Sequence, residues 1–177
     1  MKWLKTLALG RYRLRFGMGL ILNNGFGFGK LATMSTLLNS PTHVFAHASR
    51  SDYNYLQGAA ATFKLAKGFD LTAFASYRKI DATLNKDSAS VATILKTGYH
   101  RTLSEMNRKG NTAVSLFGGN VNWLRNGFHV GATGYYTFFN RKLNMYKEQK
   151  YRRWYPYGYD FFNASVDYGY LSRRLNI

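Results

Sequence analysis

The sequence contains no cysteine and only two prolines among its 177 residues. Without cysteine the chain cannot form a disulfide, bind a metal through thiolates or use a cysteine nucleophile. It also lacks any run of about 18 apolar residues, the length that a transmembrane helix needs, so helical membrane proteins are excluded. Membrane proteins that cross the bilayer with β-strands remain open, because such strands are short and alternate in polarity.

Acidic residues are also scarce in this chain. Only 8 Asp and Glu stand against 25 Lys and Arg, which gives a formal net charge of +17 and an isoelectric point near 10.2. Such a charge favours contact with a polyanion, and nucleic acid and anionic lipid headgroups both qualify. The net charge does not choose between these two partners, but the placement of the charges does.

Aromatic residues and glycine are abundant, with 17% Phe, Trp and Tyr and 17 glycines. Aromatic side chains favour strands. In six segments polar and apolar residues alternate with a period of two, the pattern of a strand with two different faces. The six predicted strands are residues 8–22, 53–65, 71–78, 113–123, 128–138 and 161–171.

The connections between the six segments alternate in length. Tight turns are predicted near Gly68 and at Asn126-Gly127, a pair of residues that tolerates positive φ. Residues 23–52 and 81–111 form longer loops of about thirty residues, so all long loops lie at one end, as in outer-membrane barrels. Within the second long loop, Thr102 and Glu105 have the spacing of a capping box and predict a short helix.

Charge and aromatic residues are placed along these segments as in a membrane barrel. The central positions of the apolar faces carry no Lys, Arg, Asp or Glu, and aromatic residues lie near the strand ends. Aromatic belts on either side of an apolar band are typical of membrane barrels. We therefore expect one all-β domain over residues 1–177, an antiparallel up-and-down transmembrane β-barrel, partial, with about six strands.

Several strings resemble the barrel region of Gram-negative outer-membrane β-barrel proteins that carry N-terminal helix-hairpin-helix repeats. They include "GRYRLRFGMGLILNNGFGFGK", "YNYLQGAAATFK", "TGYHRTLSE" and "DFFNASVDYGY". The resemblance covers residues 9–170 and implies an outer-membrane barrel of unsettled function, with no catalytic or ligand residues to carry over. The helix-hairpin-helix repeats are not in this sequence, so the resemblance gives no support for DNA binding through such repeats.

Two features depart from the resemblance. We do not read the basic N-terminal segment as a signal peptide, and the last residues do not end in the aromatic residue that closes a final strand. Known single-chain barrels have at least eight strands. We therefore expect a fragment of a larger barrel or a truncated gene product, which alone would aggregate or assemble with missing segments or other copies.

The first predicted strand carries arginine at alternate positions. Arg11, Arg13 and Arg15 lie opposite an uncharged face, so we expect that uncharged face to meet lipid and the arginines to point into the lumen together with Arg78. The arginines would either pair with carboxylates on a missing part of the barrel or form an anion-attracting wall. This row is the candidate functional feature of the sequence.

The glycine-rich stretch after the first strand does not match a nucleotide-binding loop. Gly25, Gly27 and Gly29 alternate strictly, and Lys30 is followed by leucine instead of the Ser or Thr that a P-loop requires. The stretch instead predicts close backbone folding at the barrel mouth.

Three histidines are candidate metal ligands or catalytic residues. His43 and His47 have the spacing of a helical zinc pair but lack the intervening glutamate of such sites, and we expect loop histidines. His129 shares a predicted inner face with Thr133 and Thr137, and Asp167 and Ser165 line another strand, but no nucleophile motif accompanies a Ser/His/Asp set here. We therefore predict no catalytic, cofactor or metal site, and no enzyme.

These observations predict a segment of an integral protein of the cell outer membrane, with a structural or a transport or pore role. Its expected partners are outer-membrane lipid and lipopolysaccharide, and the missing strands or other subunits, with no nucleic acid. The alternative is a soluble, basic, all-β protein that binds nucleic acid through aromatic and basic residues on the same strand face.

Overall fold

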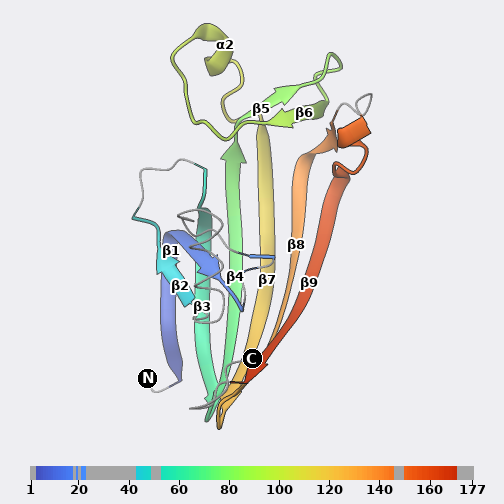
Figure 1. Cartoon of the computed structure of the whole chain (residues 1–177). Coiled ribbons are helices and arrows are strands. Elements are labelled where there is room, and N and C mark those ends of the chain that lie inside the picture. Colours follow the sequence, from blue (N-terminus) through green and yellow to red (C-terminus); the bar gives the residue numbers. More distant parts are fainter. Residues whose placement is uncertain are drawn as a thin grey trace, which may run out of the picture.

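The computed structural model describes residues 3–17, 19, 21, 22, 43–48, 53–145 and 150–170, and the fold is all-β. One sheet contains every strand, and Figure 1 shows its long strands side by side. The strands are β1 (Leu4–Arg15), β2 (His43–Ala46), β3 (Leu56–Ala66), β4 (Phe69–Ile80), β5 (Ala82–Leu84), β6 (Ser90–Ile94), β7 (Thr112–Arg125), β8 (Phe128–Asn144) and β9 (Tyr157–Tyr170). The short helix α2 (Leu103–Met106) and the 3-10 turn η1 (Lys150–Arg152) lie in connections.

The six long strands correspond to the six predicted segments. Each pairs with the next in antiparallel register, in the order β1, β3, β4, β7, β8 and β9. Strands β2, β5 and β6 were not predicted, and they lie in the long connections. Because β6 pairs with β8 in parallel, through Ser90 with Lys142 and Val91 with Leu143, the sheet is mixed and not wholly antiparallel as expected.

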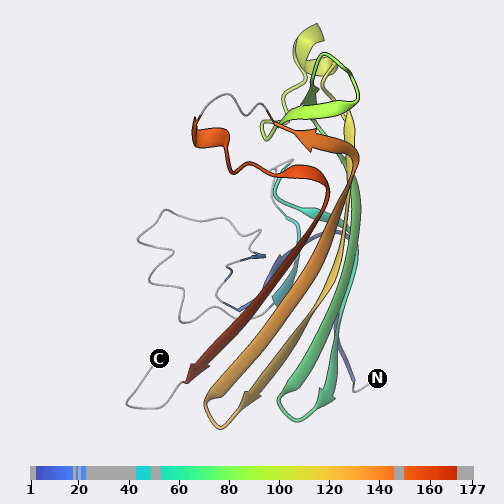
Figure 2. The same cartoon turned by 90° about the vertical axis from the view of Figure 1, so that its right-hand side faces the viewer.

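The sheet curls into a half-barrel, as Figures 1 and 2 show. Its tight turns lie at one end: Gly68 has φ +77°, and Asn126 and Gly127 have φ +51° and +84°. The described parts of the β4–β7 and β8–β9 connections lie at the other end, so the predicted alternation of loop lengths is confirmed from β3 to β9. Most of the first long connection lies outside the described residues. Within the described residues β1 and β9 do not pair with each other, and the sheet stays open between them.

The convex face of the sheet exposes large apolar side chains. On β9, Phe162, Val166 and Tyr168 are 71%, 70% and 76% exposed. The residues predicted to face outward on β3, β4, β7, β8 and β9 lie in register on this face. The central row of this face consists of Ala61, Ala73, Gly119, Gly134 and Ala164.

The concave face carries polar side chains in its lower half, towards the tight turns. Thr62, Thr72, Asn120 and Thr133 are register partners, and all four are buried. The hydroxyls of Thr62 and Thr72 are 3.0 Å apart, and Asn120 Nδ2 donates to Thr133 Oγ1 at 2.8 Å. These hydrogen bonds satisfy polar groups that would otherwise destabilise a buried face.

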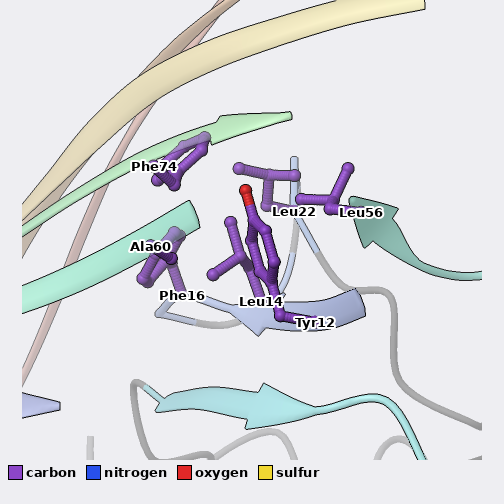
Figure 3. Close-up of a cluster of buried hydrophobic side chains, with 7 residues drawn as sticks. All are labelled: Tyr12, Leu14, Phe16, Leu22, Leu56, Ala60 and Phe74. Atoms are coloured by element: carbon purple, nitrogen blue, oxygen red, sulfur yellow. The ribbon is translucent and has the colours of Figure 1, made fainter. Parts of the chain in front are cut away.

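The prediction that the uncharged face of the first strand meets lipid is wrong. Tyr12, Leu14 and Phe16 are almost fully buried, in a cluster with Leu22, Leu56, Ala60 and Phe74. Figure 3 shows Tyr12 and Leu14 pointing from β1 towards β3 and β4, and the Tyr12 hydroxyl donates to the Ala75 carbonyl at 2.7 Å. The far half of β1 bends over the concave face with β2 (Figure 1), and this bend buries the apolar side chains.

Gly10 lies where this bend begins. Its φ of +94° is in the left-handed region that glycine adopts without strain. Before it, Leu7 and Leu9 are 56% and 73% exposed on the convex side, so the first strand contributes these residues to the outer face instead. Among the described residues no helix is long and apolar enough to cross a membrane.

Candidate functional site

A pocket of about 320 Å³ lies at the end of the concave face where the long connections gather. Five basic residues line it, from β1, from β4 and from the loops around α2: Arg11, Arg78, Lys79, Lys96 and Lys109. Tyr53 and Tyr55, which precede β3, complete the polar part of the wall. We call this the basic pocket.

Arg78 is held in the basic pocket by hydrogen bonds to the backbone. The pleat of β4 places it on the concave face, in the same row as Val114 of β7 and Phe139 of β8. Its Nη1 donates to the backbone carbonyls of Tyr53 and Tyr55, at 2.7 and 2.8 Å. Two carbonyl acceptors fix the guanidinium at the boundary between strand and loop.

The rings of Tyr53 and Tyr55 are contacted by cations of the basic pocket. The guanidinium carbons of Arg11 and Arg78 lie 4.8 and 4.7 Å from the centroid of the Tyr55 ring. Lys96 Nζ lies 5.2 Å from the centroid of the Tyr53 ring. Cations over an aromatic face are attracted by its quadrupole, so these rings hold like charges near one another.

Asp81 is the single carboxylate among the residues lining the basic pocket. Its Oδ2 lies 2.7 Å from His100 Nε2, and its Oδ1 accepts a hydrogen bond from the Gly110 amide at 2.9 Å. Both oxygens are therefore engaged. The five cations outnumber this one acid, and the pocket attracts anions.

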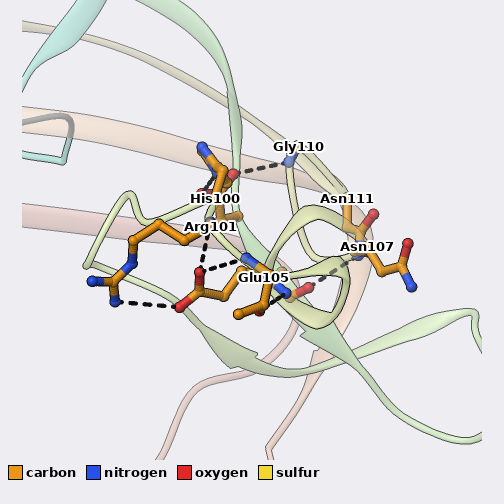
Figure 4. Close-up of polar contacts among 9 residues, drawn as sticks. His100, Arg101, Glu105, Asn107, Gly110 and Asn111 are labelled. Atoms are coloured by element: carbon orange, nitrogen blue, oxygen red, sulfur yellow. Dashed lines mark hydrogen bonds and ion pairs between the residues drawn. The ribbon is translucent and has the colours of Figure 1, made fainter.

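The loop that carries His100 and Lys109 is held in shape by a network of hydrogen bonds (Figure 4). Thr102 caps α2 by accepting from the Glu105 amide, and Glu105 accepts from the amides of Arg101 and Thr102, so the predicted capping box is confirmed. The hydrogen bond from the Arg101 amide is the main cause that lowers the pKa of Glu105 below its ordinary value. Asn111 Nδ2 joins this loop to the Ala82 carbonyl at 3.1 Å.

A second pocket, of about 240 Å³, adjoins the first on the concave face. We call it the apolar pocket, because its wall is mostly hydrophobic: Leu56, Ile80, Ile94, Val114, Leu116 and Phe139. Arg78 is the one charged residue of its lining. The two pockets share Arg78, Ile80, Tyr53 and Tyr55, which form their common wall.

The predicted arginine row is divided between two places. Arg11 and Arg78 meet at Tyr55 in the basic pocket. By the alternation of the strand, Arg13 and Arg15 lie on the face of β1 opposite Tyr12 and Leu14. Both are partly buried, and among the described residues neither Nε atom has a hydrogen-bond partner.

Sequence reasoning missed most of the pocket. The predicted strand 53–65 includes Tyr53 and Tyr55, but β3 begins only at Leu56, so strand alternation does not extend to these two residues. Lys96 and Lys109 reach the pocket because the loop around α2 folds back beside β4. A Tyr-x-Tyr pair just before a strand was the available signal, but it does not show which way the rings turn.

Two of the three histidine candidates lie in strands, His43 in β2 and His129 in β8. His129 Nε2 lies 3.4 Å from Asp167 Oδ2, so the structure brings these two together, but no hydrogen bond joins Ser165 to the histidine there. His43 is the first residue of β2 and not a loop residue. Across the described ranges no group of three His, Asp or Glu is placed to hold a metal ion.

The glycine-rich stretch with Gly25, Gly27, Gly29 and Lys30 lies outside the described residues. Its suggested role at the barrel mouth therefore stays a prediction.

Comparisons with family models, with curated proteins and with solved structures found no match to this chain. The resemblance to outer-membrane barrels with helix-hairpin-helix repeats therefore stays a prediction from the strings themselves.

Proposed function

We propose that the chain is a segment of an integral β-barrel of the cell outer membrane, with a structural role or a role in transport through a pore. The observation that carries this proposal is the convex face of the sheet. From the row of Phe117 to the row of Trp123, its positions on β3, β4, β7, β8 and β9 carry no charged side chain. A soluble protein rarely exposes an apolar patch across five strands, whereas a membrane barrel requires one.

Aromatic residues border this face at both ends. Phe138 and Phe128, 44% and 52% exposed, mark the borders on β8. The ten residue-to-residue steps from Phe128 to Phe138 span about 34 Å along a strand at 3.4 Å per step. At a tilt of roughly 40° this corresponds to about 26 Å along the membrane normal, close to the height of the apolar band in outer-membrane barrels.

The concave face would then line the lumen, with lipid and lipopolysaccharide against the convex face. Unpaired strand edges are unfavourable in a bilayer, because their amides and carbonyls have no water to bond. The open edges at β1 and β9 therefore require further strands or another copy of the chain. We assign no catalytic residues to this lumen.

A soluble nucleic-acid-binding protein is the second candidate. The contacts of Arg11 and Arg78 with Tyr55 favour it, since aromatic rings beside cations are common where single strands bind. The apolar convex face opposes it, because binding in the pocket would leave that face in water.

Fractionation of cells that express the native protein tests the proposal. We expect the protein in the outer-membrane fraction, resistant to a carbonate wash and released by detergent. Recovery in the soluble fraction without detergent would contradict membrane insertion. Salt-dependent binding of that soluble protein to an oligonucleotide would favour the second candidate.

A further inference from the structure

The basic pocket and the apolar pocket lie against each other and share Arg78. We propose that together they bind an anionic amphiphile, a molecule with a negatively charged head on an aliphatic chain. The head would lie in the basic pocket and the chain in the apolar one. This inference rests on the proposed function in one respect, that the concave face lines a lumen. Both pockets are formed by residues of this chain alone.

The basic pocket is prepared for an anion before any ligand binds. Arg78 is oriented by two backbone carbonyls, and Arg11 and Lys96 are brought near it through Tyr55 and Tyr53. Arg11 and Arg78 both contact the Tyr55 ring, and an anionic head placed beside them would be attracted by both guanidinium groups. Asp81 contributes one negative charge to the pocket lining, and His100 and the Gly110 amide already engage its two oxygens.

The apolar pocket distinguishes an amphiphile from a free anion. Ile80, Ile94, Val114 and Leu116 present aliphatic side chains, so a chain placed there would be removed from water. Phosphate would fill the basic pocket and leave this wall uncovered. A nucleobase stacks on flat aromatic faces, and although Tyr53, Tyr55 and Phe139 also line this pocket, aliphatic side chains form most of its apolar wall.

The geometry also fits general features of ligand sites. Small-molecule sites are mostly apolar clefts in which a few polar groups fix the orientation of the ligand. Here the charged groups lie at one end and the apolar side chains at the other, with Arg78 at the boundary. The head therefore sets the direction in which the chain enters.

Photocrosslinking tests the proposal on the full chain, in envelope membranes and after purification. The probe is a 12-carbon fatty acid with a diazirine at its far end. We expect crosslinks to peptides that contain Ile94, Val114 or Leu116, and competition by unlabelled dodecanoate and dodecyl sulfate. Dodecanol and inorganic phosphate should compete at least about tenfold less well, because each supplies only half of the ligand.

Two kinds of variant locate the head and the chain. Arg78→Gln should weaken competition by dodecanoate roughly tenfold, as expected for the loss of a charge-assisted contact. If that variant does not fold, the double variant Lys96→Gln with Lys109→Gln tests the same requirement, because it also removes positive charge from the basic pocket. Lys142→Gln is the matched control, because its ammonium lies over the Tyr157 ring, away from both pockets.

Equal competition by dodecanol would reduce the site to an apolar cavity and overturn the proposal. Displacement by phosphate alone, or by an oligonucleotide and not by dodecanoate, would overturn it in favour of another ligand. No labelling of a protein that fractionates with the outer membrane would overturn this inference and leave the proposed function standing. Labelling of a chain recovered as soluble would support the inference while contradicting the proposed function.

Discussion

The two faces of the curled sheet come from the same strands but carry different side chains. On the convex face Ala73, Gly119, Gly134 and Ala164 form one row, whereas their neighbours in the chain, among them Thr72 and Asn120, form a polar row on the concave face. Charge follows the same division in the central rows, where the convex positions carry none and Asp70 and Asp167 lie on the concave side. Alternation of this kind places polar groups where they can bond to one another and apolar groups where lipid would cover them.

Removal of a buried side chain contributed by β1 is the most destabilising change that we predict. Leu14→Ala should lower the free energy of unfolding by about 2–5 kcal/mol, because it leaves a cavity against Phe74 and Ala60. Leu9→Ala, on the convex side of the same strand, is the control and should lower it by about 1 kcal/mol or less, because Leu9 packs against no such cluster. Urea titration of the protein in lipid bilayers measures both. Equal losses would contradict the burial of the far half of β1.

A charge placed on each face tests the comparison at two adjacent residues of β9. Ala164→Arg on the convex face should make insertion less favourable by about 2–4 kcal/mol, the cost of an arginine near the bilayer centre. Ser165→Arg on the concave face should have a much smaller effect. The inserted and folded fraction, measured by its resistance to protease, reports both. Equal effects of the two arginines would mean that the faces do not differ in environment.

The polar row of the concave face can be weakened without adding charge. Asn120→Ala removes the donor to Thr133 Oγ1 and leaves that hydroxyl short of a partner in a buried position. We expect a loss of about 1–3 kcal/mol in the free energy of unfolding. Gly119→Ala, next to Asn120 in the chain but on the convex face, provides the comparison for this loss of stability. The methyl group added at Gly119 would lie 3.3 Å from the Thr72 carbonyl oxygen. A neutral Asn120→Ala would show that water already replaces the hydrogen bond.

The smallest predicted effect is a local response of α2 to pH. Hydrogen bonds from the amides of Arg101 and Thr102 lower the pKa of Glu105 in the folded state. The contribution of the Glu105 carboxylate to stability is therefore fully present above the pKa that Glu105 has in the unfolded chain. This contribution is lost as the pH falls through the lowered pKa of the folded state. Hydrogen exchange at the Glu105 amide should quicken in that range relative to a β7 amide. In Glu105→Gln this difference between acidic and neutral pH should disappear.

The sequence predicted the elements that depend on local pattern. Alternation located the six long strands, and turn and capping residues located Asn126-Gly127 and the start of α2. It did not predict the parallel contact of β6 with β8, because that contact joins residues about fifty positions apart through a loop that has no repeating pattern.

The errors at the first strand and at the pocket have a common physical origin. A period of two separates Tyr12 from Arg13, but it does not tell which face is buried once the strand bends at Gly10. Tyr55 lies next to Arg78 through contacts between loop and strand, which depend on the tertiary fold. Arg78 itself was placed by alternation alone, because β4 keeps an unbroken register with β7 from Phe69 to Ile80.

The absence of cysteine allows the most direct test of the account, which is cysteine scanning of β8. Single cysteines at residues 129–136 would carry a spin label in a protein reconstituted into lipid. Relaxation by oxygen, which is soluble in lipid, and by a water-soluble nickel complex would be compared at each position. We predict an alternation, with oxygen accessibility high at Val130, Ala132, Gly134 and Tyr136 and low at the residues between them. Equal access of the nickel complex to all eight positions would contradict a lipid-facing convex surface.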